Sequence, residues 1–267
     1  MTRRRVKLPR ALRAAAYPPS GLVPCWTDLP DDGEPLPDAV TAVLPDDSIP
    51  YPISRALGRL LACLVLRGGV RSVLELGAGS SSVVLARSLA LMGGGRLTSV
   101  ESWPEWCTEQ WEAVEQTSGV DAHMEVAVPR FRVLRSGPSF VFATARPAIE
   151  ARGPFDLLFV DAPQCDYGRD GALPLVLGLL APGAVIVLDD AGRLQEQWAA
   201  RRWLQTYPWL SLAGYRPTFG RHGVAVLKVD GTASGSRGAW RAWVSGSVHA
   251  AVNSVARWEN SRGSAGP

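Results

Sequence analysis

The sequence is poor in cysteine and has no long apolar run. The four cysteines are widely spaced, at Cys25, Cys63, Cys107 and Cys165. Without a C-x-x-C pair, neither a zinc site nor a disulfide framework is expected. No apolar run reaches the roughly 18 residues that a membrane helix needs, and no signal-peptide-like apolar segment follows the N-terminal arginines. We therefore expect reduced thiols, no membrane span and a cytoplasmic location.

Lysine is nearly absent, since only Lys7 and Lys228 occur among the 28 basic residues. The net charge is +3, with basic residues crowded at the N-terminus and acids following between Asp28 and Asp47. A short basic tip of this kind is typical of a solvated leader, so no nucleic-acid partner is expected. The bias toward arginine suggests GC-rich coding and a specialised bacterial pathway.

Short apolar runs alternate with helical stretches over most of the chain. Strands are expected at 72–76, 96–101, 124–128, 155–161, 184–188, 210–215 and 223–229. Alternation with helices requires parallel pairing, whereas the last two runs have no long helix between them and should pair antiparallel. The sequence predicts an α/β fold with a doubly wound, mostly parallel seven-stranded sheet and an antiparallel edge strand.

The chain divides into three predicted regions. Residues 1–50 are a basic and then acidic extended leader, 51–230 the compact domain, and 231–267 a Gly/Ser linker with a tryptophan-rich amphipathic helix. The apolar positions of this helix recur at helical spacing, at Trp240, Trp243, Val244, Val248, Val252 and Val255. Such a stripe covers the parent domain or a partner, so a homodimer through this helix is one expectation.

Two helices have predicted boundaries. Apolar residues at helical spacing over 53–66 predict a core-facing helix that stops at Gly68. After the second strand, Ser102 and Glu105 have the spacing of a capping box. The helix that they predict would turn Trp106 inward.

A strand, a glycine-bearing turn and a helix follow one another over 73–81. Gly77 and Gly79 lack Cβ atoms, so a ligand could approach the backbone at the helix N-terminus. A nicotinamide dinucleotide site has a similar turn. However, Ser82 stands where that pattern needs a third small residue, and Glu75 would repel a pyrophosphate. Glu75 suits a cationic ligand better.

Glu101 ends the next predicted strand, 22 residues after Gly79. A carboxylate at this place accepts hydrogen bonds from both hydroxyls of a ribose, whichever nucleoside cofactor is bound. Trp103 follows directly. Its ring would pack against the adenine face or against the start of the next helix.

The chain resembles the class I S-adenosylmethionine-dependent methyltransferases through ELGAGSS at 75–81, SVE at 99–101, FDLLFVDA at 155–162 and LAPGAVIVLDD at 180–190. The resemblance covers about residues 53–229 and is strongest to small-molecule O-methyltransferases of the catechol and caffeoyl-CoA type. It implies that Glu75, Gly77 and Gly79 cradle the methionine part of the cofactor and that Glu101 holds its ribose. Ser81 replaces the family's third glycine, and its hydroxyl would bond the cofactor carboxylate.

Acidic residues end the fourth and fifth predicted strands. Asp161, Asp189 and Asp190 lie at the carboxyl edge, where open α/β sheets bind their ligands. In the metal-dependent relatives, acidic groups at these positions hold Mg²⁺, which would acidify an acceptor hydroxyl. In the other interpretation, Asp189 or Asp190 caps the next helix, while Asp161 bonds the cofactor amine or orders a loop. The cofactors expected are S-adenosylmethionine and, in the first interpretation, Mg²⁺.

The general base is harder to assign. Metal-dependent relatives place a lysine shortly after the strand-four acid, where this chain has Gln164. The candidates are Asp161 and His222, whose imidazole titrates in a useful range. The run from Asp161 to Gln164 also lacks the second proline and the aromatic residue with which methyltransferases hold a flipped base.

We therefore expect methyl transfer to a small molecule, at a hydroxyl oxygen and with Mg²⁺ as an optional aid. Two alternatives stay open. One is an aminopropyl transferase on the same fold, with a decarboxylated sulfonium cofactor. The other is a non-catalytic binding or assembly protein that uses the C-terminal helix to contact a partner.

Overall fold

A large central sheet organises the protein. The computed structural model describes residues 22–27, 29–30, 33–48, 52–134, 137–163, 169–232 and 247. The sheet contains β1 (Cys25–Trp26), β2 (Ser72–Leu76), β3 (Gly95–Glu101), β4 (Val120–Val126), β7 (Phe155–Val160), β8 (Leu180–Asp189), β9 (Leu210–Arg216) and β10 (Val224–Val229). A separate ribbon is formed by β5 (Arg130–Leu134) and β6 (Gly137–Val141).

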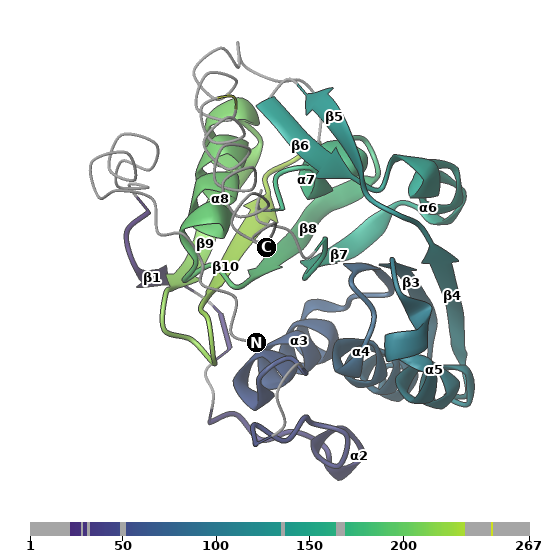
Figure 1. The fold of residues 1–267 in the computed structure, drawn as a ribbon. Coiled ribbons are helices and arrows are strands. Elements are labelled where there is room, and N and C mark those ends of the chain that lie inside the picture. The colour runs from purple at the N-terminus through teal and green to yellow at the C-terminus, as the bar shows by residue number, and fades with distance from the viewer. Residues whose placement is uncertain are drawn as a thin grey trace, which may run out of the picture.

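The strand order of the sheet is β1-β9-β10-β8-β7-β2-β3-β4 (Figure 1). Strands β8, β7, β2, β3 and β4 run parallel, and β10, β9 and β1 continue the sheet in antiparallel fashion. The predicted α/β fold with a doubly wound, mostly parallel sheet is thereby confirmed. The sheet has one strand more than predicted, because β1 adds to β9 at the antiparallel edge.

Helices cover both faces of the sheet (Figure 1). They are α3 (Arg55–Gly68), α4 (Ser80–Leu91), α5 (Thr108–Glu115), α6 (Arg146–Arg152), α7 (Ala172–Leu175) and α8 (Leu194–Thr206). Helix α2 (Asp38–Thr41) packs against α3 and α4 instead of the sheet. Two cores result from the alternation of side chains along each strand. Val73 and Leu157 pack with α3, α4 and α5, whereas Leu74 and Leu158 pack with α6, α7 and α8. Because both faces are covered, β2 and β7 are apolar except for Ser72, Glu75 and Asp156.

Helix α3 begins two residues after the predicted start and ends at the predicted glycine. The side chain of Ser54 accepts a hydrogen bond from Leu57 N at 3.2 Å and caps the N-terminus. Gly69 follows the last turn with φ of 64°, in the left-handed region that favours glycine. The predicted helix over 53–66, with its glycine stop, is confirmed.

The described residues between 22 and 48 form regular structure, although the sequence predicts an extended leader there. Besides β1, this segment supplies α2, in which Val40 is completely buried. The ribbon β5–β6 occupies a stretch to which the sequence analysis assigned no element. The apolar positions of the predicted C-terminal helix lie outside the described residues, so the predicted homodimer stays a prediction. No helix in the described part of the chain is long and apolar enough to cross a membrane.

The start of β3 lies against the start of β4 through two glycines. Gly94 has φ of 103°, and a Cβ at this position would collide with the carbonyl oxygen of Gly119. We expect Gly94→Ala to destabilise the protein by more than the roughly 1–2 kcal/mol that a left-handed non-glycine residue costs. Gly93→Ala is the matched control, because φ is 84° there but the nearest atom, on Arg71, is 4.0 Å away. Urea unfolding measures both variants, and equal losses would contradict the collision.

Candidate active site

The glycine turn between β2 and α4 opens toward solvent on one side only. Gly77 N donates to Val100 O at 2.9 Å, and φ of Gly77 is 100°. A Cβ at Gly77 would come within 3.1 Å of the Cβ of Ala162, which follows β7. At Gly79, an added Cβ would meet nothing within 4 Å. The turn therefore packs closely against β7 through Gly77 and leaves room for a ligand at Gly79.

Glu75 lies completely buried beneath this turn. Its Oε1 accepts a hydrogen bond from Ser81 Oγ at 2.5 Å, and its Oε2 accepts from Ser82 Oγ and Ser99 Oγ at 2.6 Å each. Burial raises the pKa of Glu75 to about 7, although the three hydroxyls act in the opposite direction by stabilising the carboxylate. Both carboxylate oxygens are thus engaged within the protein.

These bonds bear on the expected roles of Glu75 and Ser81. The sequence suggested that both face the cofactor. In the structure Ser81 is 2% exposed and its hydroxyl is directed to Glu75, not to the open side of the turn. Ser82 Oγ also accepts from Gly79 N at 2.9 Å, which ties the same carboxylate to the turn backbone. Glu75 and Ser81 therefore stabilise the turn from its buried side.

Glu101 lies at the open side of the turn. Its Oε2 accepts from Ala78 N at 3.0 Å, and its Oε1 accepts from Ser102 N at 2.5 Å and Trp103 N at 2.9 Å. The side chain remains partly exposed. The structure therefore brings Glu101 and the glycine turn together, as the sequence predicts for a ribose-binding acid.

The segment after Glu101 differs from the predicted capped helix. Pro104–Trp106 is a short 3-10 helix, and α5 begins only at Thr108 without a side-chain cap. The predicted inward orientation of Trp106 is wrong, because this side chain is 79% exposed. Its ring lies 6.2 Å from that of Trp103, which is 52% exposed. Two tryptophans are thus available beside Glu101.

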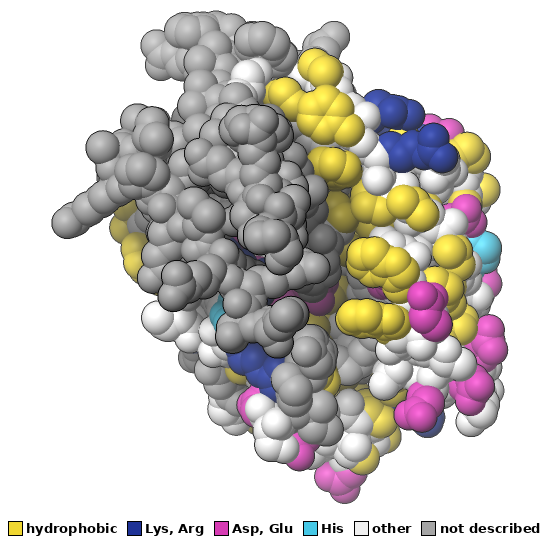
Figure 2. Space-filling model, viewed as in Figure 1, with side chains coloured by type: hydrophobic (Ala, Val, Ile, Leu, Met, Phe, Trp, Pro, Cys, Tyr) yellow, Lys and Arg dark blue, Asp and Glu magenta, His cyan; other side chains and the backbone are white. Residues whose placement is uncertain are grey.

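Further apolar side chains gather on the same face of the molecule (Figure 2). Large exposed ones near the ends of β4 and along β5 are Val126, Val128, Phe131 and Val133. Phe131 and Val133 belong to the ribbon, whereas Val126 ends β4 and Val128 lies between β4 and the ribbon. This apolar surface is typical of a place where a ligand or partner binds.

The three predicted acids come together at the ends of β7 and β8. A ligand atom from each of Asp161, Asp189 and Asp190 lies within 4.8 Å of the others. The buried guanidinium of Arg169 contacts all three residues: Nη2 donates to Asp161 Oδ1 and Asp190 Oδ2 at 2.7 Å each, and Nη1 donates to Asp189 O at 2.8 Å. Its side chain is 1% exposed.

Mg²⁺ fits this arrangement poorly. The donor set alone would suit a hard cation, but the guanidinium bonds two of its three carboxylates and supplies the positive charge. An added divalent ion would meet a fixed positive group a few ångströms away. No catalytic step is therefore assigned to a metal. Arg169 was missed from sequence, because it lies in a stretch without period between β7 and α7.

The turn after β8 holds Asp190 in an unusual conformation. Its φ is 60°, in the left-handed region that few residues other than glycine adopt. The turn is closed by Asp190 N, which donates to Asp189 Oδ1 at 2.7 Å, and Asp190 Oδ2 also pairs with Arg193 at 2.9 Å. This conformation directs the Asp190 carboxylate to Arg169.

Several acidic groups here have raised pKa values. Burial, followed by the charge of Asp190, raises the pKa of Asp189 to about 6. Burial also raises the pKa of Asp161, against the effect of Arg169. Glu196 at the start of α8, which the sequence did not single out, is buried and has a pKa raised to about 7 by that burial. Perturbed acids in one cluster are typical of a functional site.

His222 lies close to these acids through its backbone. Its carbonyl oxygen accepts from Gly192 N at 2.6 Å, in the turn that follows Asp190. The side chain itself is exposed. The structure thus places His222 at the same edge of the sheet, and no hydrogen bond to an acid of the cluster fixes its imidazole among the described residues.

The sequence model of a family described as a methyltransferase domain matches residues 74–191. This range runs from β2 to the turn after β8 and includes the glycine turn, Glu101 and the three acids. Residues 74–191 of this chain are an S-adenosylmethionine-dependent methyltransferase domain.

Solved structures share the fold of the methyltransferase. Cofactor-bound Rv0187 from MTB is 28% identical, with 73% of this chain and 87% of that chain covered and a TM-score of 0.51. TomG from Streptomyces achromogenes, an O-methyltransferase of tomaymycin synthesis in complex with SAM, is 23% identical over 74% and 92% of the two chains, with a TM-score of 0.51. An O-methyltransferase from Bacillus cereus in complex with SAH is 20% identical over 73% and 92%, with a TM-score of 0.52. No curated protein matches this chain.

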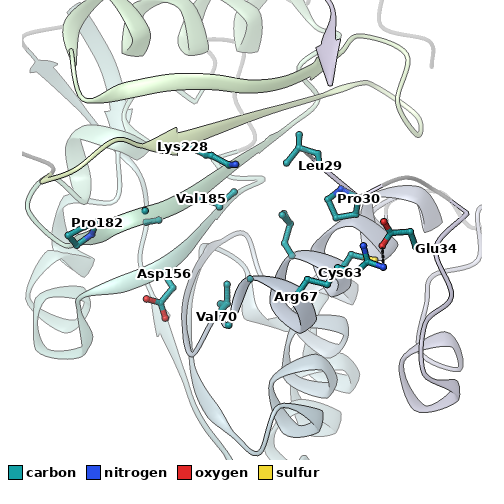
Figure 3. Close-up of a pocket in the computed structure, with 15 residues that line it drawn as sticks. Leu29, Pro30, Glu34, Cys63, Arg67, Val70, Asp156, Pro182, Val185 and Lys228 are labelled. Carbon is teal, nitrogen blue, oxygen red and sulfur yellow. Dashed lines mark ion pairs between the residues drawn. The ribbon is translucent and has the colours of Figure 1, made fainter. Parts of the chain in front are cut away.

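A cavity of about 560 Å³ lies at the opposite, amino edge of the sheet. Figure 3 shows Lys228, Leu29 and Asp156 around it, with Arg67 paired to Glu34 at one side. Asp156 Oδ2 already accepts two backbone amides at 2.9 Å each. The cavity shares no lining residue with the acidic cluster or with the glycine turn.

The raised pKa of Glu75 predicts a specific dependence of stability on pH. Between its ordinary 4.5 and about 7, the folded methyltransferase keeps a proton that the unfolded chain has lost. The stabilisation is complete below about pH 4.5 and is lost as the pH rises through about 7. Glu75→Gln removes this effect, so its unfolding free energy should rise relative to the wild type by up to about 3 kcal/mol between about pH 5 and 8.

Urea unfolding at each pH measures the change, with Glu109→Gln on the exposed face of α5 as the control. We expect Glu109→Gln to follow the wild type at every pH. A constant difference between Glu75→Gln and the wild type would show that Glu75 titrates normally.

Proposed function

We propose that the methyltransferase transfers the methyl group of S-adenosylmethionine to a hydroxyl oxygen of a small molecule. One observation carries this proposal: the open side of the glycine turn and the acidic cluster lie side by side at one sheet edge, with Gly77 packed against Ala162. A bound sulfonium would therefore be close to carboxylates that take up a proton. Two structures of this fold are named O-methyltransferases, which supports oxygen as the acceptor atom.

The residues around the turn suggest how the cofactor lies. Glu101 already accepts three backbone amides and keeps accepting capacity at Oε2, where it would accept a ribose hydroxyl. The open face at Gly79 leaves space for the methionine part, and Trp103 would cover the adenine ring. Glu75 would attract the positive sulfonium electrostatically through the turn, without contacting it.

The reaction asks for alignment and for one proton acceptor. The acceptor oxygen attacks the methyl carbon in line with the carbon–sulfur bond. The new carbon–oxygen bond forms as the carbon–sulfur bond breaks, and its electron pair stays on sulfur, so that the sulfonium becomes a neutral thioether. Holding the reactants in this line removes much of the entropic barrier. The hydroxyl proton must pass to a base.

Asp189 is the group that we assign as this base, with Asp161 beside it to orient the acceptor. Arg169 bonds the Asp161 carboxylate but only the backbone carbonyl of Asp189. Asp189 is partly exposed, and its pKa is raised to about 6. A carboxylate of this pKa is charged at neutral pH and is a stronger base than an ordinary aspartate.

Cofactor binding tests the assignment of Glu101. We expect Glu101→Gln to weaken S-adenosylmethionine binding about 10- to 100-fold, because one charge-assisted acceptor of the ribose is lost. Isothermal titration calorimetry measures the dissociation constant. Glu105→Gln, an exposed residue of the same segment, should bind as the wild type does. Unchanged affinity in Glu101→Gln would disprove the role of Glu101.

Release of S-adenosylhomocysteine with a panel of small phenols and alcohols tests the base. For an accepted substrate, kcat/KM of the wild type should rise with pH and level off above about 6, because Asp189 must lose its proton to act. Asp189→Asn should lower kcat about 10²- to 10⁴-fold and remove this limb. If His222→Gln, and not Asp189→Asn, abolishes the limb, the imidazole is the base.

A further inference from the structure

A single guanidinium occupies the centre of the acidic cluster. Arg169 Nη2 bridges Asp161 and Asp190, each at 2.7 Å, while Nη1 reaches the backbone of Asp189 at 2.8 Å. Charge-assisted bonds of this length are the strong ones. Through them the arginine links the ends of β7 and β8, which are the two strands that a metal ion bound to the same acids would also link.

The guanidinium and a metal ion cannot bind the same oxygens together. Mg²⁺ would need ligand oxygens at about 2.0–2.1 Å, among groups that lie within 4.8 Å of one another. Arg169 already uses one carboxylate oxygen from each of two of these acids. An arginine keeps its charge at every pH of interest, so a divalent ion would also meet a like charge at close range.

The backbone around Arg169 is fixed by a second set of hydrogen bonds. The next residue, Asp170, is buried, and its Oδ1 accepts a hydrogen bond from Arg202 Nε of α8 at 2.7 Å. The Nε1 of Trp203 donates to Asp170 O at 3.0 Å, and Ala172 N donates to Arg169 O at 3.0 Å. These bonds fix the backbone at Arg169 and Asp170, while the charge-assisted bonds to Asp161 and Asp190 hold the guanidinium itself.

We propose that Arg169 takes the place of a divalent cation in this methyltransferase: its side chain is the resident cation of the acidic site and keeps metal ions out. It is a positioning residue, because at 1% exposure it holds Asp161 and Asp190 without reaching an acceptor. Methyl transfer then proceeds without metal. This last part depends on the proposed function, whereas the exclusion of metal does not.

Titration with Mn²⁺, followed by electron paramagnetic resonance, tests the exclusion without any acceptor. The wild type should leave Mn²⁺ free. Arg169→Ala frees the carboxylates of Asp161 and Asp190 beside that of Asp189. This variant should bind one Mn²⁺ at least tenfold more tightly than the wild type, with a rise in melting temperature on addition of the ion. Arg169→Lys keeps a positive charge and should stay close to the wild type.

Arg202→Ala is the matched control for Arg169→Ala. It also removes a buried, ion-paired arginine, at 1% exposure, but it leaves the cation of the acidic cluster in place. We expect no gain in Mn²⁺ affinity. A gain equal to that of Arg169→Ala would mean that loosening the fold, not emptying the site, admits the ion, and would overturn the proposal.

The wild type decides the outcome even where a variant fails to fold. Stoichiometric binding of Mn²⁺ to the wild type, lost in Asp161→Asn, would overturn the proposal. A folded Arg169→Ala that gains no affinity would do so as well. Turnover in chelator should equal turnover with added Mg²⁺, and a large drop in chelator would be a further contradiction. Failure of the proposed function would instead show as absence of S-adenosylmethionine binding or of turnover under both conditions.

Discussion

The contact of the Arg169 guanidinium with the acids around it is the interaction on which the catalytic edge depends. Asp161, Asp189, Asp190 and Glu196 lie close together and largely out of solvent. Without a partner, each buried charge would cost several kcal/mol. One arginine, joined to both strand ends and fixed through its neighbour to α8, makes this concentration of acids compatible with a stable fold. The edge is therefore assembled before any ligand arrives.

The protein buries its acids in two different ways. Around Arg169 the partners are charged, whereas Glu75 receives only neutral serine hydroxyls. The charged partner fixes the positions of the acids and compensates their charge. The neutral hydroxyls leave Glu75 with a pKa of about 7, so that its protonated and ionised forms are nearly equally populated at neutral pH. Negative groups thus lie both beneath and beside the opening at Gly79, which suits a cofactor that is positive before the reaction and loses that charge during it.

The sheet, the glycine turn, Glu101 and the three acids could be predicted from the sequence, because each depends on a local pattern: apolar runs, glycine spacing, or an acid at a strand end. Arg169 could not be predicted, since a lone arginine in an aperiodic stretch is recognised only when the tertiary structure brings its partners together. The predicted inward orientation of Trp106 was wrong for a local reason. Pro104 favours a short 3-10 turn, so the helix starts later and the indole lies outside. The ribbon β5–β6 was missed although the alternation from Arg130 to Val133 and the run Ser136-Gly137-Pro138 are hairpin signals.

A sheet of this kind has two open edges, and β1 protects one of them by adding to β9. The other edge is β4, where Asp121 pairs with Arg152 and His123 lies 3.5 Å from Glu125. A strand from a second copy would have to bring these ionisable groups together and strip them of water, which charged edge strands are known to prevent. Growth of the sheet from molecule to molecule through β4 is thereby disfavoured.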